Sequence, residues 1–389
     1  MPEIKHDCRY YRGSKPCRWN KEHNVECSDC RFYSQYNEKI LIIKLDAMGD
    51  VLRTTCILPK IRERYPSAYI VWVVKSESRE LLVSNPFIDE VWNYEDMETL
   101  SRLHVHAWDY VYNLDNAHAS CALASVAKSG EKTGFVLSER GTIMPTNEPA
   151  MKWLRMASFD RIKKENLQSY QAILHEICGF PPPFEKPCLV IPEAFSKKAA
   201  TFVKEKLPVA NAQKYIIGVN TGSGARWSLK MLEENKIIGL IDVLLSHNPD
   251  FHILLLGGPN EREKNANIMS AVNSERIANA GCDHSLLGFS AIISKCDTIV
   301  CGDTLALHIA TALGIPSVVC FGPTSSSEIY DYDGLINKVC SQTLSCLSCY
   351  NNICHETLTC MDSISLDEIR EKIGILFLRA RNRDFEIAV

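Results

Sequence analysis

The 389-residue chain lacks the long apolar runs that would cross a membrane. No stretch reaches the roughly 18 consecutive apolar residues of a membrane-spanning helix. The opening residues, MPEIKHDCRYYRG, also lack the apolar core of a signal peptide. We therefore expect a cytoplasmic protein with at most peripheral membrane contact.

A large charge of one sign is missing as well. The chain carries 43 Lys and Arg against 47 Asp and Glu, a net charge of −4. Residues 1–38, which are rich in cysteine and aromatics, carry seven basic and six acidic side chains. Nucleic-acid binding depends on a clear basic surplus, so we expect no nucleic-acid partner.

Hydrophobic patterning predicts two α/β domains. Apolar, β-branched strands at 40–45 and 69–74 alternate with helical spacing at 51–65 and 119–130, as in a doubly wound parallel sheet. The alternation restarts at strand 215–220, after a proline-rich stretch. We expect a cysteine-rich module over 1–38, Rossmann-like domains over 39–195 and 196–364, and a terminal helix over 365–389.

The first candidate site follows the strand at 40–45. Gly49 permits a tight turn, and Asp50 stands where a helix begins. Asp50 could cap that helix or act as a general base at the carboxyl end of a strand, where doubly wound sheets bind ligands. Asp46, equally near the strand end, competes for the catalytic role.

Three further loops follow strands of the second domain. In the loop 220–230, glycines and small hydroxyls precede a helix, whose N–H groups attract phosphate, and Arg226 and Lys230 add positive charge. Asp303 could bond sugar hydroxyls, and Glu261 or Glu263 could accept ribose hydroxyls. The alternatives are a plain strand-to-helix loop, solvated acids and, for His308, a core histidine.

Two motifs carry a resemblance to a known family. GDVLRTTCILPKIRERYP, residues 49–66, is similar to the first-helix signature of the glycosyltransferase family 9 heptosyltransferases. GDTLALHIATALGIPSVVCFGPTSS, residues 302–326, resembles their donor-domain signature. The resemblance runs from about residue 39 to 335. It implies a GT-B fold and inverting transfer of heptose from ADP-heptose without a catalytic metal.

The resemblance also assigns roles to residues. Asp50 matches the family's catalytic base. The donor-binding set that we expect is Thr221, Ser223, Arg226, Lys230, Glu261, Asp303, Thr304 and His308. Leu305 departs from the family's glycine, and Ala225 stands where the phosphate-binding lysine is usual.

The acceptor is open at this point. The resemblance favours lipopolysaccharide core or a related glycolipid, which would place the protein at the inner face of the inner membrane. A protein hydroxyl is the alternative acceptor, and a sugar-nucleotide-binding protein without turnover is the alternative to an enzyme. A homo-oligomer is compatible with the sequence.

Seventeen cysteines form two clusters and a scattered set. Single cysteines within apolar runs, such as Cys56 and Cys301, are expected to be small buried side chains. The clustered thiols predict structural zinc or iron, against surface thiols in the first cluster and disulfides in the second. The first cluster comprises Cys8, Cys17, Cys27 and Cys30, with His6 and His23 as substitutes, and the second Cys346, Cys349, Cys354 and Cys360.

Overall fold

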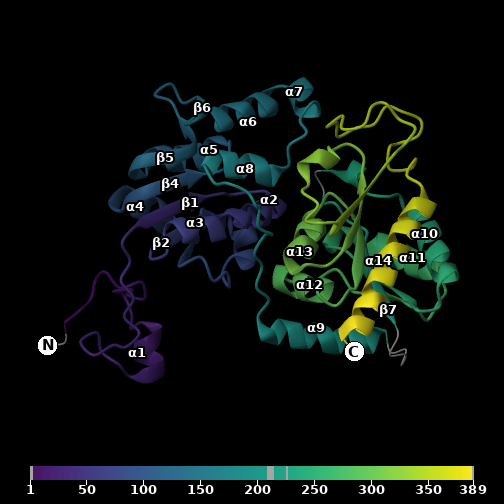
Figure 1. Cartoon of the computed structure of the whole chain (residues 1–389), viewed down its shortest axis with the longest axis horizontal. Coiled ribbons are helices and arrows are strands. Elements are labelled where there is room, and N and C mark those ends of the chain that lie inside the picture. Colours follow the sequence, from purple (N-terminus) through teal and green to yellow (C-terminus); the bar gives the residue numbers. More distant parts are fainter. Residues whose placement is uncertain (1–2, 208–213, 225–226, 388–389) are drawn as a thin grey trace. The chain divides into compact units, whose positions relative to one another are not determined.

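The computed structural model describes residues 3–207, 214–224 and 227–387. The chain divides into two compact units (Figure 1). Unit 1 comprises Met1–Ala47, Cys56–Leu154 and Leu174–Glu185; unit 2 comprises Met48–Thr55, Arg155–Ile173 and Lys186–Val389. The short segment that contains Asp50 therefore belongs to unit 2, although it directly follows a strand of unit 1.

Unit 1 is built on a six-stranded sheet of order β3-β2-β1-β4-β5-β6, parallel except for the β5–β6 pair. Its strands are β1 Lys39–Ile43, β2 Tyr69–Val74, β3 Glu90–Asn93, β4 Ala107–Asn113, β5 Lys128–Leu137 and β6 Ile143–Pro145. The helices of this half of the chain are α1 Arg18–His23, α2 Met48–Thr54, α3 Leu58–Arg64, α4 Met97–Val105, α5 His118–Val126, α6 Glu148–Ser158, α7 Asp160–Lys164 and α8 Tyr170–Cys178. Every residue of β2 is buried, as expected for an apolar strand covered on both faces.

Unit 2 repeats the design with a fully parallel sheet of order β12-β11-β10-β7-β8-β9. Its strands are β7 Tyr215–Asn220, β8 Phe251–Leu256, β9 Ile277–Asn279, β10 Thr298–Gly302, β11 Ser317–Phe321 and β12 Ile336–Cys340. Its other helices are α9 Glu193–Lys206, α10 Glu234–His247, α11 Arg262–Ala271, α12 Leu286–Ile293, α13 Leu305–Leu313 and α14 Leu366–Ile387. The predicted pair of Rossmann-like sheets is confirmed.

Each sheet has one switch point, where the chain order of the strands reverses. In unit 1 the switch point lies between β1 and β4, and in unit 2 between β7 and β10. In open α/β sheets the crevice at the carboxyl ends of these strands binds ligands. The loops that follow β1, β4, β7 and β10 are therefore expected to carry the ligand-binding and catalytic residues.

Two predicted helices differ from the structure. The helix expected over 51–65 is split into α2, a 3₁₀ turn at Thr55–Ile57 and α3. Pro59, at the start of α3, has no N–H to donate, and the Thr55 hydroxyl donates to the Leu52 carbonyl. The helix expected to end at Gly130 was wrong at its end, because Lys128 already pairs with Ala107 in the β4–β5 ladder.

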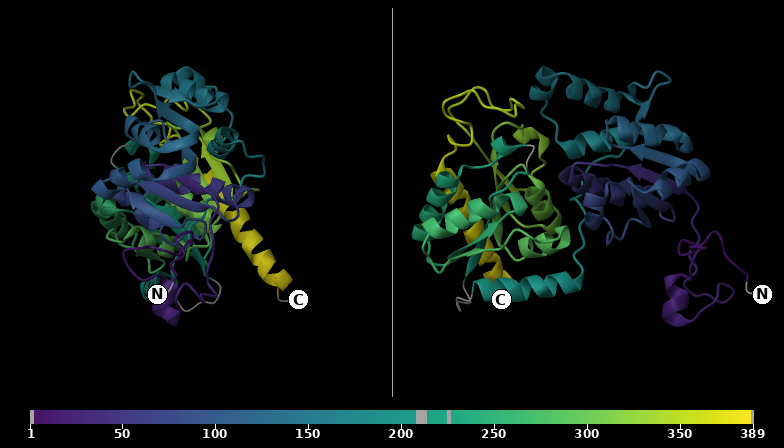
Figure 2. Two further views of the ribbon diagram at one scale, coloured as in Figure 1. Left: turned by 90° about the vertical axis from the view of Figure 1, so that its left-hand side faces the viewer. Right: turned by 180° about the vertical axis from the view of Figure 1, so that it is seen from behind.

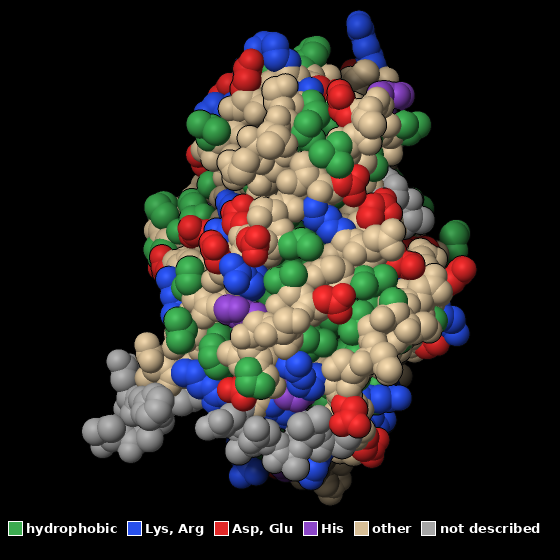
Figure 3. All heavy atoms as spheres, turned by 90° about the vertical axis from the view of Figure 1, so that its right-hand side faces the viewer, with side chains coloured by type: hydrophobic (Ala, Val, Ile, Leu, Met, Phe, Trp, Pro, Cys, Tyr) green, Lys and Arg blue, Asp and Glu red, His purple; other side chains and the backbone are tan. Residues whose placement is uncertain are grey.

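Gly314 ends α13 in the left-handed conformation, with φ of 72°. The Ser365 hydroxyl accepts from the N–H of Glu368 at the start of α14, which packs on α10, β11 and β12 (Figure 2). No helix in the described part of the chain is long and apolar enough to cross a membrane. Acidic, basic and apolar side chains are interspersed on the face shown in Figure 3.

Candidate active site

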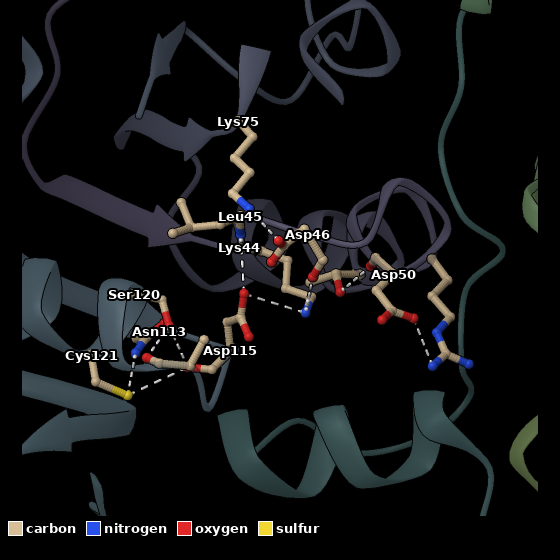
Figure 4. Close-up of polar contacts among 12 residues, drawn as sticks. Lys44, Leu45, Asp46, Asp50, Lys75, Asn113, Asp115, Ser120 and Cys121 are labelled. Carbon is tan, nitrogen blue, oxygen red and sulfur yellow. Dashed lines mark hydrogen bonds and ion pairs between the residues drawn. The ribbon is translucent and has the colours of Figure 1, made fainter. Parts of the chain in front are cut away.

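Asp50 lies in the first turn of α2 and is held by an arginine on the same helix. Its Oδ1 is 2.8 Å from Nη2 of Arg53, an ion pair drawn in Figure 4. The Asp50 side chain is about one third exposed, at 35%, whereas Arg53 is buried. The guanidinium of Arg53 lies 3.6 Å from the centre of the Tyr170 ring, so a cation–π contact fixes the group that orients Asp50.

Gly49 brings the start of α2 into contact with α13. A Cβ atom at position 49 would lie 2.6 Å from Cδ2 of His308, closer than any real side chain tolerates. The glycine is therefore required by this close approach. Within unit 2, the contact places the start of the first motif, residues 49–55, beside the motif of residues 302–326.

Asp303, at the carboxyl end of β10, is the centre of a polar cluster. Its Oδ2 accepts from Nζ of Lys230 at 2.8 Å and from the hydroxyl of Thr324 at 2.9 Å. Nε2 of His308 is 3.9 Å from its Oδ1. The cluster joins the loop after β7, the loop after β10 and helix α13, as the switch-point rule predicts.

Electrostatics fix the charges of this cluster. Burial would raise the pKa of Asp303, but Lys230, His308 and Arg53 outweigh it and hold the pKa well below its usual range. Burial, followed by Arg53, lowers the pKa of His308 to about 4 against the opposing effect of Asp303 and Asp50. Near neutral pH the cluster thus combines an ionised carboxylate with a neutral imidazole.

The competing carboxylate, Asp46, has a different environment. Its Oδ2 lies 2.5 Å from Nζ of Lys75 (Figure 4). Lys44, at the end of β1, donates to the Asp46 carbonyl and lies 3.6 Å from Asp115, which also accepts from the N–H of Leu45. These contacts tie Asp46 and Asp115 to the loops that follow β1 and β4 in unit 1.

The loop after β7 directs its hydroxyls inward. The Thr221 hydroxyl is 3.0 Å from the Leu256 carbonyl and 2.5 Å from Oδ1 of Asn265, and Ser223 donates to the Trp227 carbonyl. The side chain of Thr221 is buried. The N–H of Thr221 also donates to the Leu256 carbonyl at 2.9 Å, so both its hydroxyl and its N–H are engaged within the protein. Arg226 and Ala225 lie outside the described residues.

Two charged side chains flank the same loop. A Cβ atom on Gly222 would lie 2.4 Å from Cδ of Glu261, whose Oε2 accepts from the N–H of Gly258. Nζ of Lys264 donates to the carbonyls of Leu232 and Thr221 at 2.9 and 3.4 Å, and burial lowers its pKa. Lys264 brings a cation to the region that lacks the family's lysine.

Sequence reasoning missed three residues of the cluster and its surroundings. The pairing of Arg53 with Asp50 could have been predicted, because residues three apart lie on the same face of a helix. The positions of Tyr170 and Lys264 could not have been predicted from sequence spacing, since only the fold brings Tyr170 close to Arg53 and Lys264 close to Thr221. Of the expected donor-binding set, Lys230, Asp303 and His308 are in direct or near contact, and Asn220 donates to the hydroxyl of Thr304 at 3.4 Å.

Comparisons with known proteins agree with this geometry. The model of glycosyltransferase family 9 (heptosyltransferase) matches residues 98–359, more than half of the chain. The chain belongs to glycosyltransferase family 9. This family 9 member is accordingly a glycosyltransferase.

Individual relatives are distant but cover most of both chains. The family 9 protein is 24% identical over 304 residues to lipopolysaccharide heptosyltransferase 2 of Salmonella typhimurium, covering 74% of this chain and 83% of the relative. The solved structure of E. coli ADP-heptose lps heptosyltransferase II has a TM-score of 0.67 at 20% identity, covering 88% and 99%. E. coli heptosyltransferase WaaC with ADP has a TM-score of 0.55 at 16% identity, covering 86% and 97%. These structures confirm the fold.

None of the cysteines of the family 9 protein, all of which the structure describes, forms a disulfide. The scattered set is confirmed as core: Cys56, Cys121, Cys296, Cys301 and Cys320 are buried. In the second cluster, burial, followed by the nearby Cys349 and Cys354, raises the pKa of Cys360 to about 11, and Cys346 is exposed. No group of three or more His, Cys, Asp or Glu among the described residues is arranged to hold a single metal ion. A metal on the second cluster stays a prediction.

Proposed function

We propose that the protein transfers heptose from ADP-heptose, with inversion at the anomeric carbon, to a hydroxyl of lipopolysaccharide core or a related glycolipid. Family membership and the names of its relatives support this donor and acceptor. With such an acceptor the protein would work at the inner face of the inner membrane.

One observation carries the proposal: the contact between Gly49 and His308, which brings Asp50 beside the β10 switch point. Inverting transfer needs a group that accepts the proton of the attacking hydroxyl. Asp50 is the partly exposed carboxylate of this cluster, whereas Asp303 is committed to Lys230 and Thr324. We therefore assign the general base to Asp50 and a structural and donor-orienting role to Asp303.

The same cluster would receive the donor. Departure of ADP places growing negative charge on its phosphates, which fixed cations and N–H groups stabilise. Lys230 and Lys264 flank the loop after β7, and the start of α13 lies beside it through Asn220 and Thr304. The acidic Glu261 lies over Gly222, where it would accept hydroxyls of the ribose.

A transfer assay with defined acceptors tests the proposal. The protein is incubated with ADP-heptose and either a heptose-free lipopolysaccharide core glycolipid or a serine-rich peptide. The masses of the products are then measured by mass spectrometry. We expect a heptose added to the glycolipid and release of ADP. Addition to the peptide alone would reassign the acceptor. Calorimetric binding of ADP-heptose without any product would instead show a binding protein.

A further inference from the structure

Residues 3–38 form a segment with little regular structure of its own. Its helix α1 spans six residues, and its one recorded β contact is a bridge between Cys8 and Gln35 (Figure 1). None of the side chains of residues 3–38, all of which are described, is buried. A segment that buries so little apolar surface cannot offset the entropy of ordering its backbone, so it needs a cross-link of another kind.

A cavity of about 300 Å³ lies within this segment and is lined by all four of its cysteines, Cys8, Cys17, Cys27 and Cys30. Much of the remaining lining is apolar or aromatic and includes Ile4, Tyr10, Trp19 and Val25. Cys8 begins a turn closed by the N–H of Tyr11, Cys17 immediately precedes α1, and Cys30 begins a turn closed by Tyr33. The turns present four thiols from separate points of the chain to one space.

The thiols surround a space and not a single point. One zinc or iron ion keeps each thiolate sulfur about 2.3 Å away, and hence the sulfurs within about 4 Å of one another. No three metal-ligating side chains of the described residues are gathered in this way. The volume is also about ten times the roughly 30 Å³ that one water occupies in the liquid. A larger inorganic body fits the arrangement better than a single ion does.

We propose that Cys8, Cys17, Cys27 and Cys30 bind a 4Fe–4S cluster, with one thiolate on each iron. Each thiol releases its proton as its sulfur–iron bond forms, and iron with inorganic sulfide supplies the rest of the cluster. The charged part of the lining comprises Lys5 and Lys15 together with Glu3 and Glu26. The pocket is open to solvent on one side, and its four cysteines are half-buried.

The cluster has a structural role. Arg9 lies 3.5 Å from Asp89, and Arg12 lies 3.4 Å from Glu90 and donates to the Tyr69 hydroxyl, so that the segment is bound to the starts of β2 and β3. These contacts involve the amino ends of the strands, whereas the transfer site lies at carboxyl ends. Removing the cluster should therefore release the segment from unit 1 without changing the residues around Asp303.

Elemental analysis of the full chain, purified without oxygen, tests the proposal. We expect about four acid-labile sulfides per chain with about four irons, or about five where the second cluster also holds an iron ion, and the broad visible absorption of thiolate-bound iron. One zinc per chain without labile sulfide would overturn the proposal, as would protein that contains neither metal.

Matched double variants test the location. Cys27→Ser with Cys30→Ser should remove the labile sulfide and leave ADP affinity within about twofold of the unmodified chain. Cys346→Ser with Cys349→Ser alters the other Cys-x-x-Cys pair and should retain the sulfide, because iron bound there as a single ion carries none. Retention in the first variant, or loss in the second alone, would overturn the assignment to Cys8, Cys17, Cys27 and Cys30.

Discussion

The two switch points carry the same kind of ion pair in different surroundings. In unit 1, Lys44 lies 3.6 Å from Asp115; in unit 2, Lys230 lies 2.8 Å from Asp303. Both pairs link the loops that follow the two central strands. Asp115 accepts the main-chain N–H of Leu45 and so holds the loop that follows β1, whereas Asp303 is joined by Thr324 and His308 and influenced by Arg53. The shared topology thus places a Lys–Asp ion pair at each switch point. The groups around each pair then determine whether it can take part in binding or catalysis.

The largest expected difference between the two switch points comes from protonation of His308, which lies beside the Lys230–Asp303 pair. Because its folded-state pKa of about 4 lies below the ordinary 6.5, the unfolded chain binds the extra proton first as the pH falls. Stability is therefore fully retained above pH 6.5 and lost toward pH 4, by about 3 kcal/mol. In His308→Gln this part of the pH dependence of urea unfolding should disappear.

The exposed His104, on α4, provides the control for this prediction. His104→Gln should leave the slope of stability between pH 6.5 and 4 unchanged. An equal slope in His308→Gln and the unmodified chain would show that His308 is not held neutral by its surroundings.

The two lysines provide the next comparison. Lys230→Met and Lys44→Met each remove the cation from a buried carboxylate, and each should cost about 3 kcal/mol of unfolding free energy. Lys230→Met should also raise the KM for the donor about tenfold. Of these two lysines, only Lys230 lies in the loop after β7, which we assign to the donor phosphates. Steady-state kinetics with varied ADP-heptose measure this difference. A similar rise in Lys44→Met would mean that the unit 1 switch point also binds donor.

The smallest expected effect concerns the contact between α2 and α13. Gly49→Ala would place a Cβ atom against His308, which should cost about 1–2 kcal/mol and lower kcat by displacing Asp50. Gly374→Ala is the matched control, since nothing lies within 4 Å of a Cβ there in α14. It should gain up to about 1 kcal/mol. Unchanged kcat and stability in Gly49→Ala would argue against a tight contact.

The sequence was most informative where one physical signal dominates. Strands 69–74 and 215–220 have the predicted bounds because uninterrupted apolar, β-branched runs suit a covered parallel strand. Asp303 and His308 were identified because they follow a strand within one motif. The 51–65 helix was predicted as continuous because its apolar period continues through the 3₁₀ turn, where hydrogen bonds of Thr55 decide the structure.

Contacts between distant segments could not be predicted in this way. Tyr170 reaches Arg53, and Lys264 reaches the Thr221 carbonyl, only through the packing of separate elements. The ion pair of Lys44 with Asp115 likewise depends on β1 and β4 being neighbours. The sequence does not encode such pairs as a spacing, so they appear only once the strand order is known.

The most direct test of the account compares the two carboxylates near the end of β1. Heptose transfer by Asp50→Ala and Asp46→Ala is measured at saturating ADP-heptose, and ADP affinity by calorimetry. We predict that Asp50→Ala lowers kcat by about 10²–10⁴-fold with unchanged ADP affinity, whereas Asp46→Ala stays within about tenfold of the unmodified chain. Full activity of Asp50→Ala, or a loss confined to Asp46→Ala, would contradict the assignment of Asp50 as the base.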